Sequence, residues 1–331
     1  MFYEKLEGGV VQCNLCSHHC RISEGKRGIC GVRQNISGKL YSLVYGKLVA
    51  SAVDPIEKKP LFHFLPGSRA YSIATVGCNF RCMNCQNYDI SQMPKPDKPV
   101  RGSEVTPEEI VKTAKRYSCQ SIAYTYTEPT VFFEYAYETA KLAAEEGIRN
   151  ILVTNGYITP EALKTIAPYL DAANIDLKSS SDKFYQKVCG ARLQPVLEAI
   201  RLYKKLGIWI EITTLVIPSL NDSEDDLRKI AEFIKEVDEG IPWHVSRFFP
   251  AFKLSALPPT PLSTLNKARK IGLESRLRYV YQGNASGEGE NTFCHKCGRL
   301  LIERCGYNVR QNNIKESQCP YCGTEINGVW T

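Results

Sequence analysis

The sequence lacks the features expected of a membrane-spanning or secreted chain. No uncharged apolar run approaches the roughly 18 residues that a membrane-spanning helix needs, and the opening MFYEKLEGG carries acidic residues and no apolar signal core. No block of consecutive Lys or Arg is present, and 42 Lys and Arg against 35 Asp and Glu leave a net charge of only +7. We therefore expect a cytoplasmic protein that tolerates anionic ligands but has no membrane or nucleic-acid partner.

Low-complexity segments and long internal repeats are also missing. Together with 43% apolar residues, this excludes the disordered and fibrous classes. A chain of 331 residues is long enough for two or three domains.

Cysteine is the residue type that is present in unusual number. Without a signal peptide the thiols stay reduced, so clustered cysteines are better interpreted as metal ligands than as disulfides. Eleven of the 14 fall into three groups: Cys13, Cys16, Cys20 and Cys30; Cys78, Cys82 and Cys85; Cys294, Cys297, Cys319 and Cys322. We expect the remaining Cys119, Cys189 and Cys305 to be small buried hydrophobic residues.

Between about residues 70 and 285, short β-branched or aromatic runs alternate with helical stretches, which predicts repeated βα units and a parallel sheet. The six expected strands are Tyr71–Val76, Ser121–Tyr126, Asn150–Thr154, Ala173–Leu177, Trp209–Leu215 and Trp243–Arg247. Helix starts are expected at Pro107, with a capping box of Thr106 and Glu109, and at Pro160 after Thr159. Gly147 and Gly207 stand where C-terminal caps belong.

The fold class that follows is α/β. Six βα units are too few to close an eight-stranded barrel, so we expect an open, partial (βα)6 barrel with a side gap that admits a large substrate. Three parts are expected: a Cys-rich N-terminal segment over residues 1–67, the barrel over residues 68–286, and a C-terminal zinc-ribbon or rubredoxin-like domain over residues 287–331.

The segment GCNFRCMNC places Cys78, Cys82 and Cys85 at C-x3-C-x2-C spacing, directly after the first barrel strand. A cubane cluster of four irons is normally held by four thiolates, so three leave one iron open for another ligand. The carboxyl end of a barrel strand is also where such folds place their chemistry. A structural zinc site or an electron-transfer cluster would need a fourth ligand, and none lies nearby in the sequence.

This loop strongly resembles that of the radical S-adenosylmethionine superfamily. The resemblance implies a 4Fe-4S cluster whose open iron is chelated by the amino and carboxylate groups of S-adenosylmethionine. One electron from the cluster then breaks a C–S bond, and the resulting 5′-deoxyadenosyl radical abstracts hydrogen from a substrate. The position before the third cysteine is usually aromatic in the superfamily but is Asn84 here, which alters the expected contact with adenine.

Polar residues follow nearly every expected strand, where they should converge on the cluster. They are Glu128, Asn155, Asp176, Lys178 and His244. The resemblance implies that Glu128 receives the S-adenosylmethionine ammonium, and activating enzymes of glycyl-radical enzymes have a similar Asp-x-Lys. Asp176 and Lys178 point the same way from an extended strand and suit ribose hydroxyls and a carboxylate. Alternatively, Glu128 is a helix-cap partner or a solvated charge, and His244 is a core histidine.

The C-terminal cysteines form two C-x2-C-G knuckles, Cys294 with Cys297 and Cys319 with Cys322. Four such thiolates fit a closed tetrahedral site for zinc or a single iron, whose expected role is to stabilise a domain too small to bury its own core. Recognition and electron delivery are the alternative roles.

The N-terminal set, CNLCSHHC with Cys30 ten residues further on, is open to two interpretations. Cys13, Cys16, Cys20 and Cys30 would hold either zinc, which we prefer at this point, or an accessory cluster. His18 or His19 is able to replace one thiolate.

The segment DPIEKKPLFHFLPG concentrates charges between prolines just before the barrel. It contains Asp54, Glu57, Lys58, Lys59 and His63. It is either a solvated linker or a segment that lines the substrate mouth.

The whole chain resembles one subgroup, the radical S-adenosylmethionine enzymes of the AmmeMemoRadiSam system, which are pyruvate formate-lyase-activating-enzyme-like. The segments that carry this resemblance are CNLCSHHCRISEGKRGICGVRQN, YGKLVASAVDPIEKKPLFHFLPGS, GCNFRCMNCQNYDIS, YTYTEPT, TFCHKCGRLLIERCGY and CPYCGTEINGVW. It implies Memo-like and AMMECR-like partner proteins and a low-potential electron donor such as flavodoxin or ferredoxin.

The sequence is compatible with three alternative functions. The first is hydrogen abstraction from a small-molecule or partner-bound substrate in a Memo-linked system. The second is activation of a glycyl-radical enzyme, with a protein glycine as substrate. The third, from another class, is a non-catalytic metal-stabilised module that binds RNA or protein; the absence of a basic stripe with interleaved aromatics speaks against it.

Overall fold

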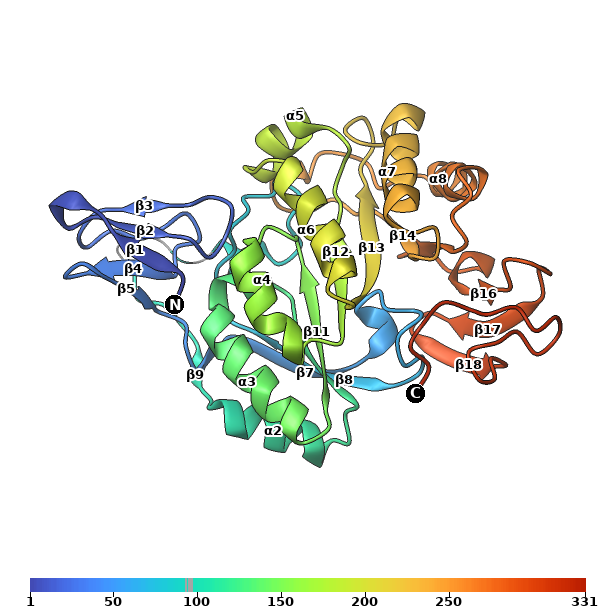
Figure 1. Cartoon of the computed structure of the whole chain (residues 1–331). Helices are drawn as coiled ribbons and strands as arrows, with labels where there is room; N and C mark the ends of the chain where they lie inside the picture. The colour runs from blue at the N-terminus through green and yellow to red at the C-terminus, as the bar shows by residue number, and fades with distance from the viewer. Residues whose placement is uncertain (93, 95–97) are drawn as a thin grey trace.

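The computed structural model describes residues 1–92, 94 and 98–331. Its centre is an eight-stranded sheet in the order β15-β14-β13-β12-β11-β10-β8-β7 (Figure 1). The strands are β7 (Ala50–Pro55), β8 (Arg69–Ala74), β10 (Ser121–Tyr124), β11 (Arg149–Thr154), β12 (Ala172–Asp176), β13 (Trp209–Val216), β14 (Trp243–Arg247) and β15 (Val280–Gly283). All neighbours from β8 to β15 pair in parallel, and β7 pairs antiparallel with β8.

This architecture confirms the expected α/β partial barrel, since the sheet is parallel and does not close on itself. All six expected strands are present within a few residues of their predicted ends. The structure adds β15 as a seventh parallel strand. It also adds β7, which precedes the boundary expected near residue 68 and yet joins the central sheet. The three-part division of the chain stays a prediction.

Helices lie along the outside of the sheet, where α3, α6 and α8 contact β11, β13 and β14. The helices are α1 (Tyr88–Ser91), α2 (Pro107–Arg116), α3 (Phe133–Glu145), α4 (Pro160–Ile166), α5 (Asp182–Phe184), α6 (Gln194–Lys205), α7 (Glu224–Val237) and α8 (Leu262–Glu274), with a π-helical turn over Tyr185–Cys189 after α5. The helices α2, α3, α6 and α8 bury apolar residues against the strands, and this packing leaves the other face of the sheet free to form a site.

The expected helix starts are present, but one cap differs from the prediction. Thr106 and Glu109 form the complete capping box of α2. The helix α4 does begin at Pro160, yet the Thr159 side chain makes no cap hydrogen bond. Its hydroxyl instead donates to the backbone oxygen of Asn14, at 2.9 Å, so this threonine ties the N-terminal segment to the barrel.

The two Cys-rich segments form small sheets on opposite sides of the barrel (Figure 1). The N-terminal segment contains β1 (Tyr3–Lys5), β2 (Val11–Cys13), β3 (Arg21–Ile22), β4 (Arg33–Ile36), β5 (Lys39–Ser42) and β6 (Lys47–Leu48), the last paired with β9 (Ser103–Glu104). The C-terminal segment contains the three-stranded sheet of β16 (Thr292–Phe293), β17 (Leu300–Cys305) and β18 (Asn308–Asn312).

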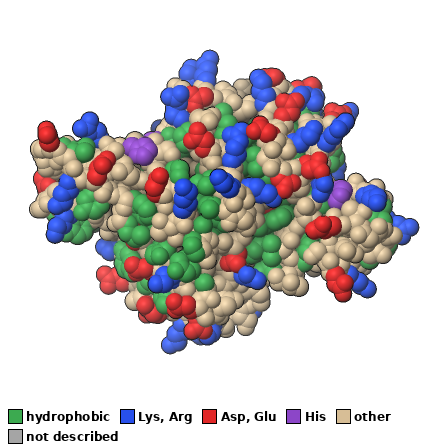
Figure 2. Space-filling model, viewed as in Figure 1, with side chains coloured by type: hydrophobic (Ala, Val, Ile, Leu, Met, Phe, Trp, Pro, Cys, Tyr) green, Lys and Arg blue, Asp and Glu red, His purple; other side chains and the backbone are tan. Residues whose placement is uncertain are grey.

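Two surface properties bear on function. Among the described residues, no helix is both long enough and apolar enough to cross a membrane. Figure 2 shows Lys and Arg side chains interspersed with Asp and Glu over the face in view, with no broad area of one sign.

Candidate active site

A cavity of about 580 Å³ opens at the carboxyl ends of the parallel strands. This volume is in the range of small-molecule sites. The eight predicted site residues all line it: Cys78, Cys82, Cys85, Glu128, Asn155, Asp176, Lys178 and His244. The structure therefore brings together every side chain that the sequence placed at this edge of the sheet.

The three-cysteine loop follows β8 and is held by its own backbone and by its neighbours. Gly77 has φ +101°, and a Cβ there would lie 2.7 Å from Val32 Cγ1, so only glycine fits against the N-terminal segment. The Phe80 amide donates to Cys78 Sγ at 3.3 Å, and Cys85 Sγ lies 3.1 Å from Ser91 Oγ. The loop thus presents its sulfurs to the cavity in fixed positions.

Cys82 has a sulfur neighbour that the sequence did not predict. The thiol of Cys189, at the end of the π-helical turn, interacts with Cys82 and lowers the pKa of Cys82. The Cys189 carbonyl also accepts from the Arg81 amide at 2.7 Å. Cys189 does not line the cavity, so its thiol supports Cys82 rather than competing for the open side of a cluster.

The cysteine loop fits a cluster better than a single ion. Among the described residues, the sulfurs of Cys78, Cys82 and Cys85 do not all lie within 4.8 Å of one another. The thiolates of one tetrahedral zinc, with bonds of about 2.3 Å, would lie roughly 3.8 Å apart. Burial raises the pKa of Cys78 and Cys85, so deprotonation of these thiols would need the positive charge of a bound metal.

Glu128 is buried, and its hydrogen bonds connect the segment after β10 to the end of β11. Its Oε1 accepts from the Thr130 hydroxyl at 2.7 Å and the Thr154 hydroxyl at 2.8 Å, and its Oε2 accepts from the Asn155 amide at 2.8 Å. Burial raises the pKa of Glu128 despite these bonds. Because a carboxylate offers about four acceptor positions, Oε2 keeps room for a donor in the cavity.

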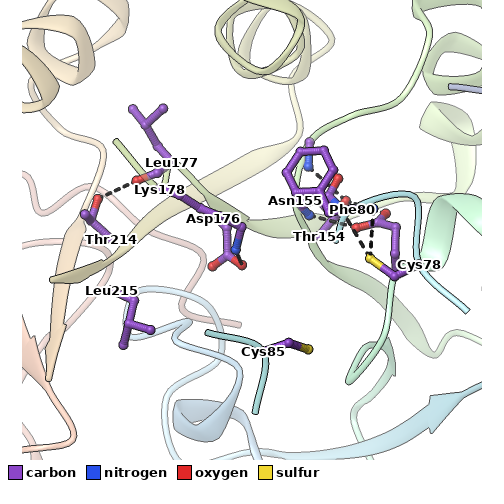
Figure 3. Close-up of polar contacts among 12 residues, drawn as sticks. Cys78, Phe80, Cys85, Thr154, Asn155, Asp176, Leu177, Lys178, Thr214 and Leu215 are labelled. Atoms are coloured by element: carbon purple, nitrogen blue, oxygen red, sulfur yellow. Dashed lines mark hydrogen bonds and ion pairs between the residues drawn. The ribbon is translucent and has the colours of Figure 1, made fainter. Parts of the chain in front are cut away.

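Asn155 links the end of β11 to the cysteine loop (Figure 3). Its Nδ2 donates to Asn79 Oδ1 at 2.8 Å and lies 3.8 Å from Cys78 Sγ. Its Oδ1 accepts from the Tyr157 amide at 2.9 Å. Asn155 therefore positions the loop that carries the first cysteine.

Asp176 and Lys178 form an ion pair at the end of β12, with Lys178 Nζ 2.6 Å from Asp176 Oδ2 (Figure 3). Burial alone would lower the pKa of Lys178, but Asp176 and the nearby sulfurs of Cys82 and Cys189 outweigh it and raise the pKa. Lys178 therefore keeps a positive charge beside the cysteine loop. The pair offers one donor and one acceptor to a bound ligand.

His244 stands on β14, in register with Thr213 of β13, which in turn pairs with Asp176 of β12. His244 Nε2 lies 2.6 Å from Glu211 Oε2, and both side chains are buried. Glu211 also accepts from the backbone amides of Phe62 and His63. The sequence analysis missed Glu211, although a lone carboxylate inside the apolar strand WIEITTLV was a visible signal.

The charged segment before the barrel contributes to the cavity wall. Glu57, Lys58 and Lys59 line the cavity, while Asp54 accepts from both lysines, at 2.8 and 2.7 Å. His63 lies behind the wall, where its Nδ1 contacts the Asn327 backbone oxygen at 2.6 Å. The solvated-linker interpretation does not describe Glu57 and Lys59, which are 1% and 2% exposed.

Three buried polar atoms of the cavity wall have no hydrogen-bond partner in the part of the chain that the structure describes: Glu57 Oε2, Asn84 Oδ1 and Thr213 Oγ1. Unsatisfied buried polar atoms are costly and mark places where a ligand or water completes the site. Together with three thiols on the same wall, they fit a cavity built for a cluster and a polar ligand.

The C-terminal cysteines form a separate and much tighter group. The sulfurs of Cys294, Cys297, Cys319 and Cys322 all lie within 4.8 Å of one another. Cys294 and Cys322 are 3.7 Å apart, as are Cys297 and Cys319. These separations match a tetrahedron around one zinc or iron ion.

The unclustered cysteines follow the prediction in part. Cys119 and Cys189 are buried, but Cys305 is exposed at the end of β17. The expectation for Cys305 was wrong because the residue ends β17 beside the turn to β18, and chain turns lie at the surface.

Comparison with known proteins places these features in a family. A family model described as the Radical SAM superfamily matches residues 72–234. The uncharacterized protein MJ0808 of Methanocaldococcus jannaschii is 52% identical over 99% of this chain and 98% of its own length. The pyruvate formate-lyase-activating enzyme of Clostridium pasteurianum is 26% identical over 62% of this chain and 80% of its own.

Solved structures of other proteins also resemble this chain in fold. A radical SAM methyltransferase from Sphaerobacter thermophilus superimposes with a TM-score of 0.52 at 13% identity, covering 72% of this chain and 71% of that one. At this identity the likeness concerns the fold alone.

Proposed function

The chain belongs to the radical S-adenosylmethionine superfamily and is related to pyruvate formate-lyase-activating enzymes, and from this premise we propose that it abstracts hydrogen from a substrate of a Memo-linked system. The observation that carries the proposal is the convergence of Cys78, Cys82 and Cys85 with five polar strand-end residues on one cavity. In this proposal Cys78, Cys82 and Cys85 hold a 4Fe-4S cluster.

When bound, the cluster supplies one electron to S-adenosylmethionine and so releases methionine and a 5′-deoxyadenosyl radical that abstracts hydrogen. The chain's own residues bind and orient the reactants. Asp176 and Lys178 offer an acceptor for a ribose hydroxyl and a cation for a carboxylate, and Glu128 Oε2 offers an acceptor for the ammonium group. The buried cavity wall excludes water from the reacting atoms.

The substrate is proposed to be a small molecule or a group presented by a partner protein. Lys58, Lys59 and Glu57 give the far wall of the cavity charges of both signs, which suits a polar substrate with an anionic group. Memo-like and AMMECR-like proteins are the proposed partners. Flavodoxin or ferredoxin is the proposed electron donor, and the cytoplasm the proposed location.

A second candidate is activation of a glycyl-radical enzyme, where the substrate is a protein glycine. It is favoured by the 26% identity to the activating enzyme of Clostridium pasteurianum. The opposing observation is the charged segment over Glu57–Lys59, because a glycine has no charged side chain to pair with these residues.

The experiment incubates reduced, reconstituted protein with S-adenosylmethionine and candidate substrates that carry deuterium. Transfer of deuterium into 5′-deoxyadenosine from a small molecule, with or without the Memo-like partner, supports the first candidate. Transfer only from a partner protein labelled at glycine supports the second. No transfer from any labelled candidate, with S-adenosylmethionine cleavage intact, would contradict the Memo-linked proposal.

A non-catalytic binding module is the rival from another class. On the face that Figure 2 shows, Lys and Arg alternate with Asp and Glu, so this face has no extended basic path for nucleic acid. Salt-dependent RNA affinity together with zinc in all three cysteine groups would support this rival.

A further inference from the structure

The N-terminal cysteines surround a second, much smaller pocket that the proposed reaction does not use. Cys13, Cys16, Cys20 and Cys30 all line it. The pocket lies in the N-terminal segment, which Figure 1 shows on the opposite side of the barrel from the C-terminal cysteines. Four thiols around one space form a candidate metal site.

The N-terminal thiols are not gathered as closely as the four C-terminal thiols. Among the described residues, no three of them lie within 4.8 Å of one another, with or without His18 and His19. The C-terminal thiols meet that limit in the same structure. Cys78, Cys82 and Cys85 likewise do not meet that limit. Four thiolates that are spaced too widely for one ion suit a cubane.

The two histidines are engaged elsewhere. His18 Nε2 lies 2.8 Å from the Asn79 backbone oxygen, and His19 Nδ1 lies 3.1 Å from Asn14 Oδ1. The site therefore has four sulfur ligands, which is the set that a 4Fe-4S cluster takes when all four irons are held by protein.

A buried arginine is a second, independent indication that the N-terminal pocket binds a ligand. Arg33 is 3% exposed and lines the pocket, and its Nη1 donates to Glu134 Oε1 at 3.0 Å. Among the described residues, the Nε of Arg33 has no hydrogen-bond partner. A buried N–H without an acceptor is costly, and a sulfur of a bound cluster would supply one.

The pocket is in direct contact with the loop that carries Cys78. Asn79 lines it, and the backbone oxygen of Cys30 lies 3.0 Å from where a Cβ on Gly77 would stand. Arg81 bridges the two loops, because its guanidinium donates to the backbone oxygen of Cys78 at 2.9 Å and also to that of Ile29.

We propose that Cys13, Cys16, Cys20 and Cys30 bind a second 4Fe-4S cluster, to which Arg33 Nε donates a hydrogen bond. This cluster replaces the zinc that the sequence alone favoured. Its position suits it to receive one electron from a reduced flavodoxin or ferredoxin and to pass one electron toward Cys78, with no bond made or broken at the relay. Only this relay role rests on the proposed function.

The test measures iron, acid-labile sulfide and zinc in anaerobically reconstituted protein. About eight irons and one zinc per chain are expected, since the C-terminal site takes the single ion. The variant with Cys13, Cys16, Cys20 and Cys30 all changed to Ala should keep about four irons. The variant with Cys78, Cys82 and Cys85 changed to Ala should also keep about four, which separates this proposal from the proposed function. Cys119→Ala is the matched control and should lose none.

A finding of about four irons in the wild type would overturn the proposal, whether a second zinc fills the N-terminal site or nothing does. If the quadruple variant fails to fold, Mössbauer counting of the two cluster types in the wild type and in the Cys78 triple variant decides the matter. Arg33→Lys keeps a charge for Glu134 but removes Nε. It should shift the midpoint potential of the N-terminal cluster to more negative values and leave the other cluster unchanged.

Discussion

The thiol of Cys189 interacts with Cys82 and lowers the pKa of Cys82, although Cys189 belongs to an element that begins more than a hundred residues later in the sequence. Hydrogen bonds to a cluster thiolate stabilise the reduced, more negative state of the cluster and raise its potential. The π-helical turn over Tyr185–Cys189 is thus part of the site.

We predict that Cys189→Ala lowers the midpoint potential of the cluster at Cys78, Cys82 and Cys85. One hydrogen bond to a charged group corresponds to a shift on the order of tens of millivolts for one electron. Redox titration followed by electron paramagnetic resonance measures it. Cys189→Ser restores a donor and should recover most of the potential, whereas an unchanged potential in Cys189→Ala would show that the thiol does not act on the cluster.

The ion pair of Asp176 and Lys178 gives a prediction for ligand binding. Lys178→Ala should raise the Kd for S-adenosylmethionine about tenfold or more, because it removes a charge-assisted hydrogen bond from the cavity wall. Calorimetry on the reconstituted protein measures this. Lys229→Ala is the control, since Lys229 is an exposed lysine in a similar pair with Asp225 on α7; equal affinities of the two variants would remove Lys178 from the binding site.

The buried pair of His244 and Glu211 gives a prediction for pH. Burial would raise the pKa of Glu211, but the bond to His244 outweighs it and holds the folded-state pKa below the ordinary value. The ionised carboxylate therefore adds stability above the unfolded-state pKa of about 4.3, and this stability is lost as pH falls through the folded-state pKa.

Glu211→Gln should accordingly lower the free energy of unfolding at pH 7 by roughly 2 kcal/mol. The difference from the wild type should shrink below pH 4. Urea unfolding followed by circular dichroism at both pH values measures it, with the exposed Glu236→Gln as a control expected to change little. A difference that grows on acidification would contradict the assigned sign.

The C-terminal group gives a prediction for metal content. Cys297→Ala should lose the one zinc or iron bound there and should make residues 287–331 sensitive to protease, because metal binding stabilises so small a unit. Metal analysis and limited proteolysis measure the two effects. Cys305→Ala removes an exposed cysteine outside the group of four and should retain the ion; equal loss in both variants would show that the four thiols are not the ligands.

Sequence patterns predicted the parts of this molecule that depend on local chemistry. The strand ends carrying Glu128, Asn155, Asp176 and His244 could be found because parallel strands alternate with capped helices and place polar residues at one edge. The spacing of Cys78, Cys82 and Cys85 in turn predicted the cluster loop.

The remainder depends on contacts between distant segments. The sequence around Cys189 does not indicate that its thiol meets Cys82. The sequence around Arg33 does not indicate that it lines the N-terminal pocket. β7 has no pattern that assigns it to the barrel sheet, since its pairing with β8 is set by the chain path between them. Thr159 matches the helix-cap pattern, yet its hydroxyl serves the N-terminal segment instead.

The central claim is that three thiols hold a cluster with one iron left for S-adenosylmethionine. The most direct test gives anaerobically reconstituted protein dithionite and S-adenosylmethionine and measures 5′-deoxyadenosine and methionine by chromatography. We predict equal release of both products by the wild type and by Cys119→Ala, and none by Cys82→Ala. Release by Cys82→Ala equal to that of the wild type, or no release by wild-type protein that carries its full complement of iron, would contradict the account.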